Sequence, residues 1–236
     1  MNRTVIPAAA VVVALVGGCA EEAGGCDAEY RLSEVKGEKR PVRIEPSTHH
    51  PGLTDRELEE ALPEPEPEAA TNDKVLNHLR QETVRMAGVM GETGPGRCAG
   101  EVDRPRGETV RCTVTYEGVT VPWLVTSKGT TSGSAGAFSQ DFVYTARPLK
   151  SVHTARAVYD WFAWEKGKNG TTDGPLAPVD PRCDRLPEVF LAEPGKETGY
   201  YCQDVSKTCT DDVQHVWWGD RPIRAEENGD LSFLAG

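Results

Sequence analysis

The sequence predicts an α+β protein made of two small modules, each a helix followed by an antiparallel sheet and each closed by a disulfide. Three observations support this fold class. Apolar residues recur with helical period over residues 73–90, β-rich runs separated by turn signals follow over residues 107–126, and the same order of elements returns after residue 151. With 236 residues, the chain is long enough for two such modules.

The first 18 residues read as a signal peptide. Arg3 precedes an apolar run over residues 5–16 that is too short to cross a bilayer, which takes about 20 apolar residues. The run ends in Leu15-Val16-Gly17-Gly18-Cys19, which resembles the lipobox of bacterial lipoproteins, here of actinobacterial type. Leu is more usual than Val16 in that family, and Ser, Ala or Thr is commoner than Gly17.

The lipobox resemblance implies that Cys19 takes a diacylglyceryl group and becomes the first residue after cleavage. Two or more acyl chains anchor a protein stably, so we expect the body at the extracytoplasmic face of the cell membrane. The alternative is an ordinary secretory signal beside a coincidental cysteine. Under either interpretation the body is exported.

Residues 19–72 have the composition of an acidic tether. Residues 20–72 contain 14 Asp and Glu against 6 Lys and Arg, and they end in the Pro-Glu run of residues 63–68. Proline opposes helix and the carboxylates repel one another, which favours an extended chain. Thr54 and Glu57 form a candidate capping box for one short helix inside this segment.

The first module is expected over residues 73–150. Asn72 or Asp73 is the candidate cap of a helix that Gly91 ends, with one apolar face made of Val75, Leu76, Leu79, Thr83, Met86, Ala87 and Met90. Residues 107–116 and 119–126 then predict two strands joined by a Glu117-Gly118 turn. Residues 129–136 are a Gly- and Ser-rich loop by composition, and residues 138–144 predict a third strand.

The second module is expected over residues 151–236, where the order of elements repeats. Ser151 is the candidate cap of a helix that runs to Lys166. Arg182-Cys183 matches Arg97-Cys98, residues 195–202 match the Gly-to-Cys strand of residues 107–112, and residues 213–218 and 231–234 predict further strands. This repetition indicates a diverged duplication, and the alternative is two unrelated segments of one domain.

The cysteines form an even set once Cys19 is assigned to lipid. In an exported chain, six cysteines predict a disulfide framework, here Cys26, Cys98, Cys112, Cys183, Cys202 and Cys209. No Cys-x-x-Cys occurs, and the cysteine spacings are wider than zinc sites need, so we predict no metal site.

The run from Cys98 through Gly107-Glu108-Thr109-Val110-Arg111-Cys112 to the Glu117-Gly118 turn resembles small exported actinobacterial domains of unknown function. That resemblance implies a helix beside an antiparallel sheet and a disulfide between the first strand and the preceding loop, here Cys98 with Cys112. The second module then fits Cys183 with Cys202, which leaves Cys26 for Cys209. The other arrangement pairs Cys202 with Cys209 and Cys183 with Cys26.

Candidate chemistry is sparse. We identify no catalytic residues and expect no cofactor, because Ser134 lacks the frame of a nucleophile elbow and His78, His153 and His215 have no partner in the sequence pattern. Trp161 and Trp164 instead lie off the apolar face of the second helix, which is made of Ala155, Val158, Tyr159, Phe162 and Ala163. The two indoles either pack against the rest of the body, such as the Trp217-Trp218 strand, or form a platform for a protein or a cell-wall sugar.

The function these features favour is non-catalytic binding or scaffolding by a lipoprotein at the cell surface. Its partners would be the membrane, through the lipid anchor, and a cell-wall or protein ligand. The formal net charge of -11 argues against nucleic acid. The alternatives are an enzyme that acts on cell-wall material and an accessory or sensor subunit of a membrane transporter or signalling complex.

Overall fold

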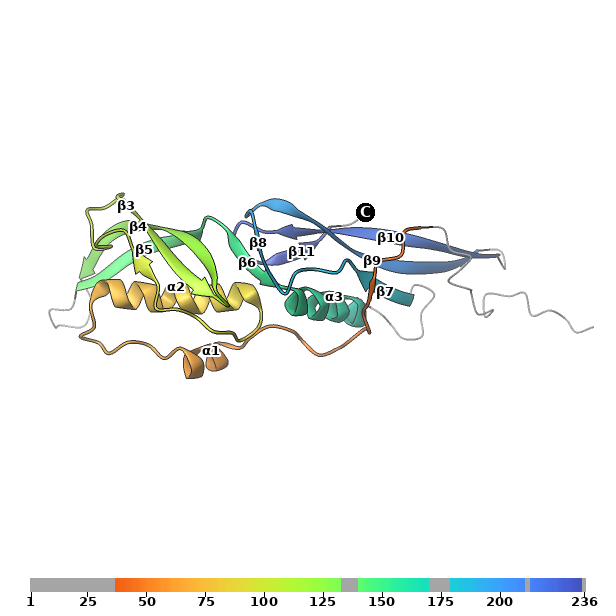
Figure 1. The fold of residues 1–236 in the computed structure, drawn as a ribbon, viewed down its shortest axis with the longest axis horizontal. Helices are drawn as coiled ribbons and strands as arrows, with labels where there is room; N and C mark the ends of the chain where they lie inside the picture. Colours follow the sequence, from red (N-terminus) through yellow and green to blue (C-terminus); the bar gives the residue numbers. More distant parts are fainter. Residues whose placement is uncertain (1–36, 133–139, 170–178, 211–212, 235–236) are drawn as a thin grey trace, which may run out of the picture.

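The computed structural model describes residues 37–132, 140–169, 179–210 and 213–234. Three helices and eleven strands form an elongated α+β body, in which two antiparallel sheets lie end to end, each with a long helix against it (Figure 1). The predicted fold class is therefore confirmed. Two hydrophobic cores lie along the long axis, one for each sheet.

The first module packs one long helix on a four-stranded sheet. The sheet has the order β2-β3-β4-β5, and the helix α2 covers one face of it beside the short helix α1. The element bounds are α1 Asp55–Ala61, α2 Thr71–Ala87, β2 Arg97–Cys98, β3 Thr109–Tyr116, β4 Val119–Ser132 and β5 Gln140–Pro148.

Alternation along β3 decides which face of this sheet is buried. Val110, Cys112, Val114 and Tyr116 are each at most 6% exposed and face α2, while the residues between them point outward. The helix presents the apolar stripe that its sequence predicts, with Val75, Leu79, Thr83 and Ala87 buried. Met90 was expected in this stripe but lies beyond the helix and is 37% exposed.

The ends of α2 differ from the sequence prediction. The helix ends at Gly88, which adopts the left-handed conformation that glycine accepts at little cost, and not at Gly91. Its N-cap is Ala70, without a side-chain hydrogen bond, and not Asn72 or Asp73. Asn72 instead joins the loop before β3, because its amide donates to Gly100 O and accepts from Val102 N.

The hairpin of β3 and β4 turns at Glu117-Gly118, as predicted. Both turn residues have positive φ, 47° and 76°, and Tyr116 pairs with Val119 across the turn. The predicted loop at residues 129–136 begins later, because β4 continues to Ser132, and β5 starts at Gln140. Residues 133–139 lie outside the described part of the chain.

The second module has a five-stranded sheet of order β1-β7-β9-β10-β11, with the helix α3 on one face. The element bounds are β1 Val42–Arg43, α3 Ala155–Asn169, β7 Val179–Cys183, β9 Lys196–Thr210, β10 Val213–Ala225 and β11 Leu231–Phe233. Val158, Phe162 and Ala163 of α3 are buried against this sheet, and the helix runs three residues beyond the predicted end at Lys166.

The main sheets of the two modules share one spatial order of strands, although β8 lies between β7 and β9 along the chain of the second module. In each module, a strand that contains Arg-Cys follows the helix and lies beside an antiparallel hairpin, β3-β4 or β9-β10. A last strand pairs with the far side of the hairpin. The resulting orders are β2-β3-β4-β5 and β7-β9-β10-β11. Cys98 pairs with Cys112 in the first sheet, as Cys183 pairs with Cys202 in the second. This correspondence supports the interpretation as a diverged duplication.

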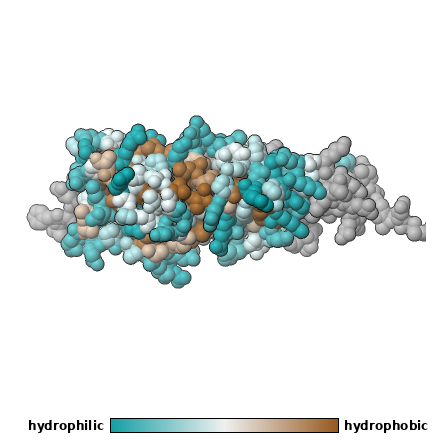
Figure 2. All heavy atoms as spheres, viewed as in Figure 1, coloured by the Kyte–Doolittle hydropathy of each residue, from teal (hydrophilic) through white to brown (hydrophobic). Residues whose placement is uncertain are grey.

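A separate two-stranded sheet joins the modules. β6 (Ser151–Thr154) pairs with β8 (Val189–Ala192), with Val152 in the first core and Phe190 in the second. Figure 2 shows hydrophobic surface gathered over the middle of the molecule, where these strands lie and where Leu191 is 39% exposed. The junction is therefore a continuation of both cores and not a polar linker.

The predicted cap of α3, Ser151, lies in β6, so that prediction is wrong. Thr154 takes the role, because its Oγ1 accepts a hydrogen bond from Ala157 N at 3.1 Å. The same hydroxyl donates to Ala87 O at the end of α2, at 2.9 Å. One threonine thus connects the last turn of the first long helix to the first turn of the second.

The expected tether is folded onto the body over much of its described length. β1 pairs with β7, so that Val42 lies opposite Cys183, and Ile44 is buried in the second core. The predicted capping box is present at α1, where Thr54 and Glu57 exchange hydrogen bonds, and it places Leu58 in the first core at 1% exposure. The extended acidic chain expected from composition is replaced here by a segment that spans both modules.

Candidate functional site

Both disulfides implied for the two modules are present. Cys98 bonds Cys112 and Cys183 bonds Cys202, with a Cα–Cα separation of 3.9 Å in each pair. Each bond joins directly paired residues of neighbouring strands, on the face that the helix covers. Because such bonds persist in oxidising compartments, they indicate an extracytoplasmic location.

The remaining cysteines give no test of the other predictions. Cys19 and Cys26 lie outside the described residues, and the Cys209 side chain on β9 is outside them as well. The pairing of Cys202 with Cys209 is excluded, since Cys202 bonds Cys183. Lipidation at Cys19 and a bond between Cys26 and Cys209 remain predictions.

Trp161 and Trp164 form one aromatic cluster with a residue of the expected tether. The two indoles meet edge to face on α3 with ring centroids 5.3 Å apart, and the His50 imidazole lies 5.3 Å from Trp161 and 4.9 Å from Trp164. Lys168 places its ammonium 4.6 Å from the centroid of the Trp164 ring. Both tryptophans are half-buried.

The cluster corresponds to neither sequence alternative in full. The chain around His50 and Gly52, which was not expected to approach α3, covers part of the two indoles. They are not a bare platform, since each keeps only part of its surface in solvent. The sequence did not predict that His50 belongs to this cluster, because the residues around it have the polar, proline-containing composition of a tether. Only the packing of residues 44–53 against the body brings His50 to α3.

Two of the other three tryptophans, Trp217 and Trp218, lie on the second sheet, and Trp123 is buried in the first. Trp217 is 45% exposed on β10. Trp218 is covered by Gly37, whose lack of a side chain allows the close approach, because an added Cβ would lie 2.2 Å from the indole Cδ1. The N-terminal part of the described chain therefore contacts this sheet as well as α3.

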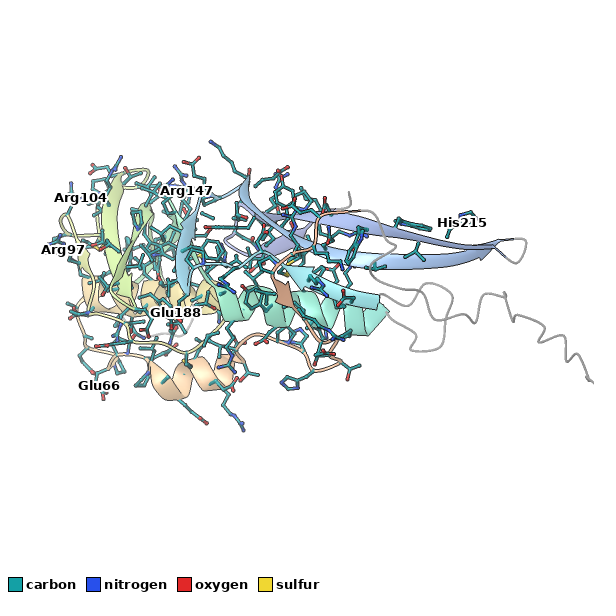
Figure 3. The ribbon with its side chains drawn as sticks, turned by 45° about the vertical axis from the view of Figure 1, so that its right-hand side comes forward. Glu66, Arg97, Arg104, Arg147, Glu188 and His215 are labelled. Carbon is teal, nitrogen blue, oxygen red and sulfur yellow. A yellow bond between two sulfur atoms is a disulfide. The ribbon has the colours of Figure 1, made fainter. Side chains whose placement is uncertain are left out.

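The histidines do not converge. His153 is fully buried in β6, where its Nε2 lies 2.8 Å from Ser151 Oγ, and burial lowers its pKa from 6.5 to about 4. His78 packs against Tyr144, and His215 projects from β10 into solvent (Figure 3). Within the described ranges, no three His, Cys, Asp or Glu residues are placed to hold a metal ion.

Buried charges between α3 and the second sheet were not foreseen from the sequence. Lys166 Nζ lies 3.1 Å from Asp204 Oδ2 and Arg221 Nε lies 3.2 Å from Asp204 Oδ1, with Lys166 and Asp204 less than 10% exposed. Since one carboxylate is shared by two cations, the group is satisfied by its own members. We interpret this buried charged group as structural. Lys166 precedes Asp204 by 38 positions and Arg221 by 55, so a local sequence pattern could not indicate the contact.

Comparison with known proteins adds no assignment. No family model, no curated protein and no solved structure matches this chain. In the part of the chain that the structure describes, no helix combines the length and apolar character needed to cross a membrane.

Proposed function

We propose that this protein is an exported lipoprotein, anchored through Cys19 at the extracytoplasmic face of the cell membrane, whose body acts as a non-catalytic binding or scaffolding module. The lipobox-like run before Cys19 supports the anchor, and the two disulfides support the oxidising compartment.

The observation that carries the binding role is the aromatic cluster on α3. Trp161, Trp164 and His50 are mutually packed, so their rings are held in place before a ligand arrives. Ordering a side chain on binding costs free energy, and tryptophans already fixed by neighbours avoid part of that cost. Tryptophan is also among the residues that contribute most at interfaces.

The anchor is tested by the intact mass of the protein extracted from its native membrane, before and after reduction with alkylation. We expect the mass of residues 19–236 plus a diacylglyceryl group, with six thiols labelled only after reduction. An unlipidated chain would exclude the anchor, and thiols labelled before reduction would exclude a complete disulfide framework.

The binding surface is tested by a photo-crosslinking residue placed in cells at position 168, beside the Trp164 ring, with position 56 as the control. Arg56 lies on α1 with its side chain 83% exposed, so it reports accidental encounters. We expect a discrete adduct from position 168 alone, and its loss when Trp161 is replaced by alanine. The same adducts from both positions would refute the assignment of this surface.

A further inference from the structure

The two sheets differ in what covers the face turned away from the helix. In the second module, the chain at residues 37–43 crosses that face. Gly37 packs on Trp218 of β10, the Arg40 guanidinium lies over the Tyr201 ring of β9, and Val42 then pairs with β7 at the sheet edge. Gln203 and Val205 point to this outer face, and they are nevertheless at most 1% exposed.

Charge complementarity holds that segment in place. Arg40 lies 3.1 Å from Asp184, which directly follows β7, and 3.5 Å from Asp220 on β10, so that one cation of the crossing chain meets two carboxylates. The Arg40 side chain is 11% exposed, which strengthens the attraction relative to a pair in water. This sheet face is thus already used to bind an extended polypeptide.

The equivalent face of the first module carries charge of one sign among its described side chains. Its outward positions carry three arginines and six threonines, with no Asp or Glu among the positions whose side chains are described: Arg97, Arg111, Arg147, Thr109, Thr113, Thr115, Thr120, Thr126, Thr145, Pro122, Leu124 and Val143. This is an unexpected face in a chain of net charge -11.

The strand register arranges these side chains in rows. Arg111 and Arg147 flank Leu124, two strands apart, which is about 10 Å between their Cα atoms. The neighbouring row is Thr109, Thr126 and Thr145, three hydroxyls in line across three strands. Arginine forks and hydroxyls are donors suited to carboxylates.

The face is open in the described part of the chain. Arg97, Arg111 and Arg147 are exposed, and none of them forms an ion pair with a described carboxylate. The central threonines are half-buried, and Thr115 Oγ1 accepts a hydrogen bond from Gly94 N at 3.0 Å. Figure 3 shows Arg97 and Arg147 at the two edge strands of the sheet, β2 and β5. Beside β2, the place that β1 takes in the second module has no described strand.

We infer that the outer face of the first sheet is a docking site for an extended acidic segment of a partner protein, which crosses β5 to β2 as residues 37–43 cross the second sheet. Main-chain pairing at the β2 edge and carboxylates at the three arginines would hold it. The inference rests on the proposed binding role for the existence of a partner, but it concerns a surface separate from the α3 cluster.

The test measures binding of a fluorescent peptide of alternating glutamate and proline to the full chain by anisotropy. We expect saturable binding that weakens as salt is added. The variant R111Q/R147Q should bind roughly tenfold more weakly, because two exposed charge-assisted contacts are lost. The matched control is R56Q/R156Q, which changes the net charge equally at two exposed helix positions and should bind as the wild type does.

Equal weakening by both double variants, or no peptide binding at all, would overturn the inference. Binding of inorganic polyphosphate or of anionic lipid vesicles without binding of the peptide would also overturn it, since the occupant would then not be a polypeptide. The measurement needs neither the lipid nor Trp164, so failure of the proposed anchor or of the α3 surface leaves this result unaffected.

Discussion

The burial of His153 predicts how the stability of the protein depends on pH. The imidazole is 0% exposed in β6, with Phe190 5.6 Å away between ring centroids, and burial lowers its pKa from 6.5 to about 4. The unfolded chain therefore binds a proton at this residue between these two values while the folded chain does not. The stability associated with neutral His153 is therefore fully present above pH 6.5, and it is lost as the pH falls from 6.5 to about 4.

The size of the effect follows from the two pKa values. At about pH 5, the folded state is expected to lose about 2 kcal/mol of stability relative to neutral pH, and about 3 kcal/mol once the pH is below both pKa values. Because His153 lies where β6 pairs with β8, the loss falls on the sheet that joins the two modules.

Urea unfolding at neutral pH and near pH 5 measures this contribution when the wild type is compared with His153→Phe. Carboxylates titrate in both proteins, so the difference between the two pH dependences isolates His153. The variant should lose about 2 kcal/mol less than the wild type on acidification. His153→Gln provides a second non-titrating side chain if phenylalanine does not fit, and an unchanged pH dependence in a folded variant would refute the reasoning.

Three further predictions concern the covalent and packed features of the body. Replacing Cys98 and Cys112 together by alanine removes a link that closes about 15 residues, and urea unfolding should show a loss of about 3 kcal/mol, whereas an unchanged midpoint would mean that the hairpin does not depend on it. Gly167→Ala should lower the melting temperature despite the better helix propensity of alanine, because the added Cβ would lie 2.2 Å from Ser47 O. The Trp emission should also shift to the red as the chain around Ser47 leaves α3. A higher melting temperature would show that this chain does not pack on α3. Asp204→Asn should cost about 3 kcal/mol in unfolding free energy, since it leaves two cations of a buried group without their carboxylate, and a loss below about 1 kcal/mol would mean that water already reaches the site.

The sequence predicted the elements whose signals are local. The apolar stripe of α2 repeats within one helix, the Glu117-Gly118 turn needs only two residues with positive φ, and the capping box at Thr54 spans one turn. Both described disulfides agree with the pairing that the resemblance to small exported domains implied for the first module and that was then fitted to the second.

Caps and helix ends were predicted less well, because several residues nearby could serve. Asn72 and Ser151 are both competent caps in isolation. In the fold, Asn72 is used by the loop at Gly100 and Ser151 lies in β6, so Ala70 and Thr154 stand at the helix starts. Tertiary hydrogen bonds decided between local alternatives of similar free energy.

What the sequence determined by itself is the α+β class and the repeated helix-and-sheet order, because each depends on residues close in the chain. The cysteine pairing was implied by a resemblance to small exported domains, and an alternative pairing stayed open until the fold was known. Only the tertiary structure decided the course of residues 37–62 and the surroundings of Trp161 and Trp164. β1 has two residues and pairs with a strand about 140 positions later, and His50 meets α3 more than 100 positions later. Such contacts leave no periodic signal, since their free energy comes from surfaces that exist only after both modules have formed.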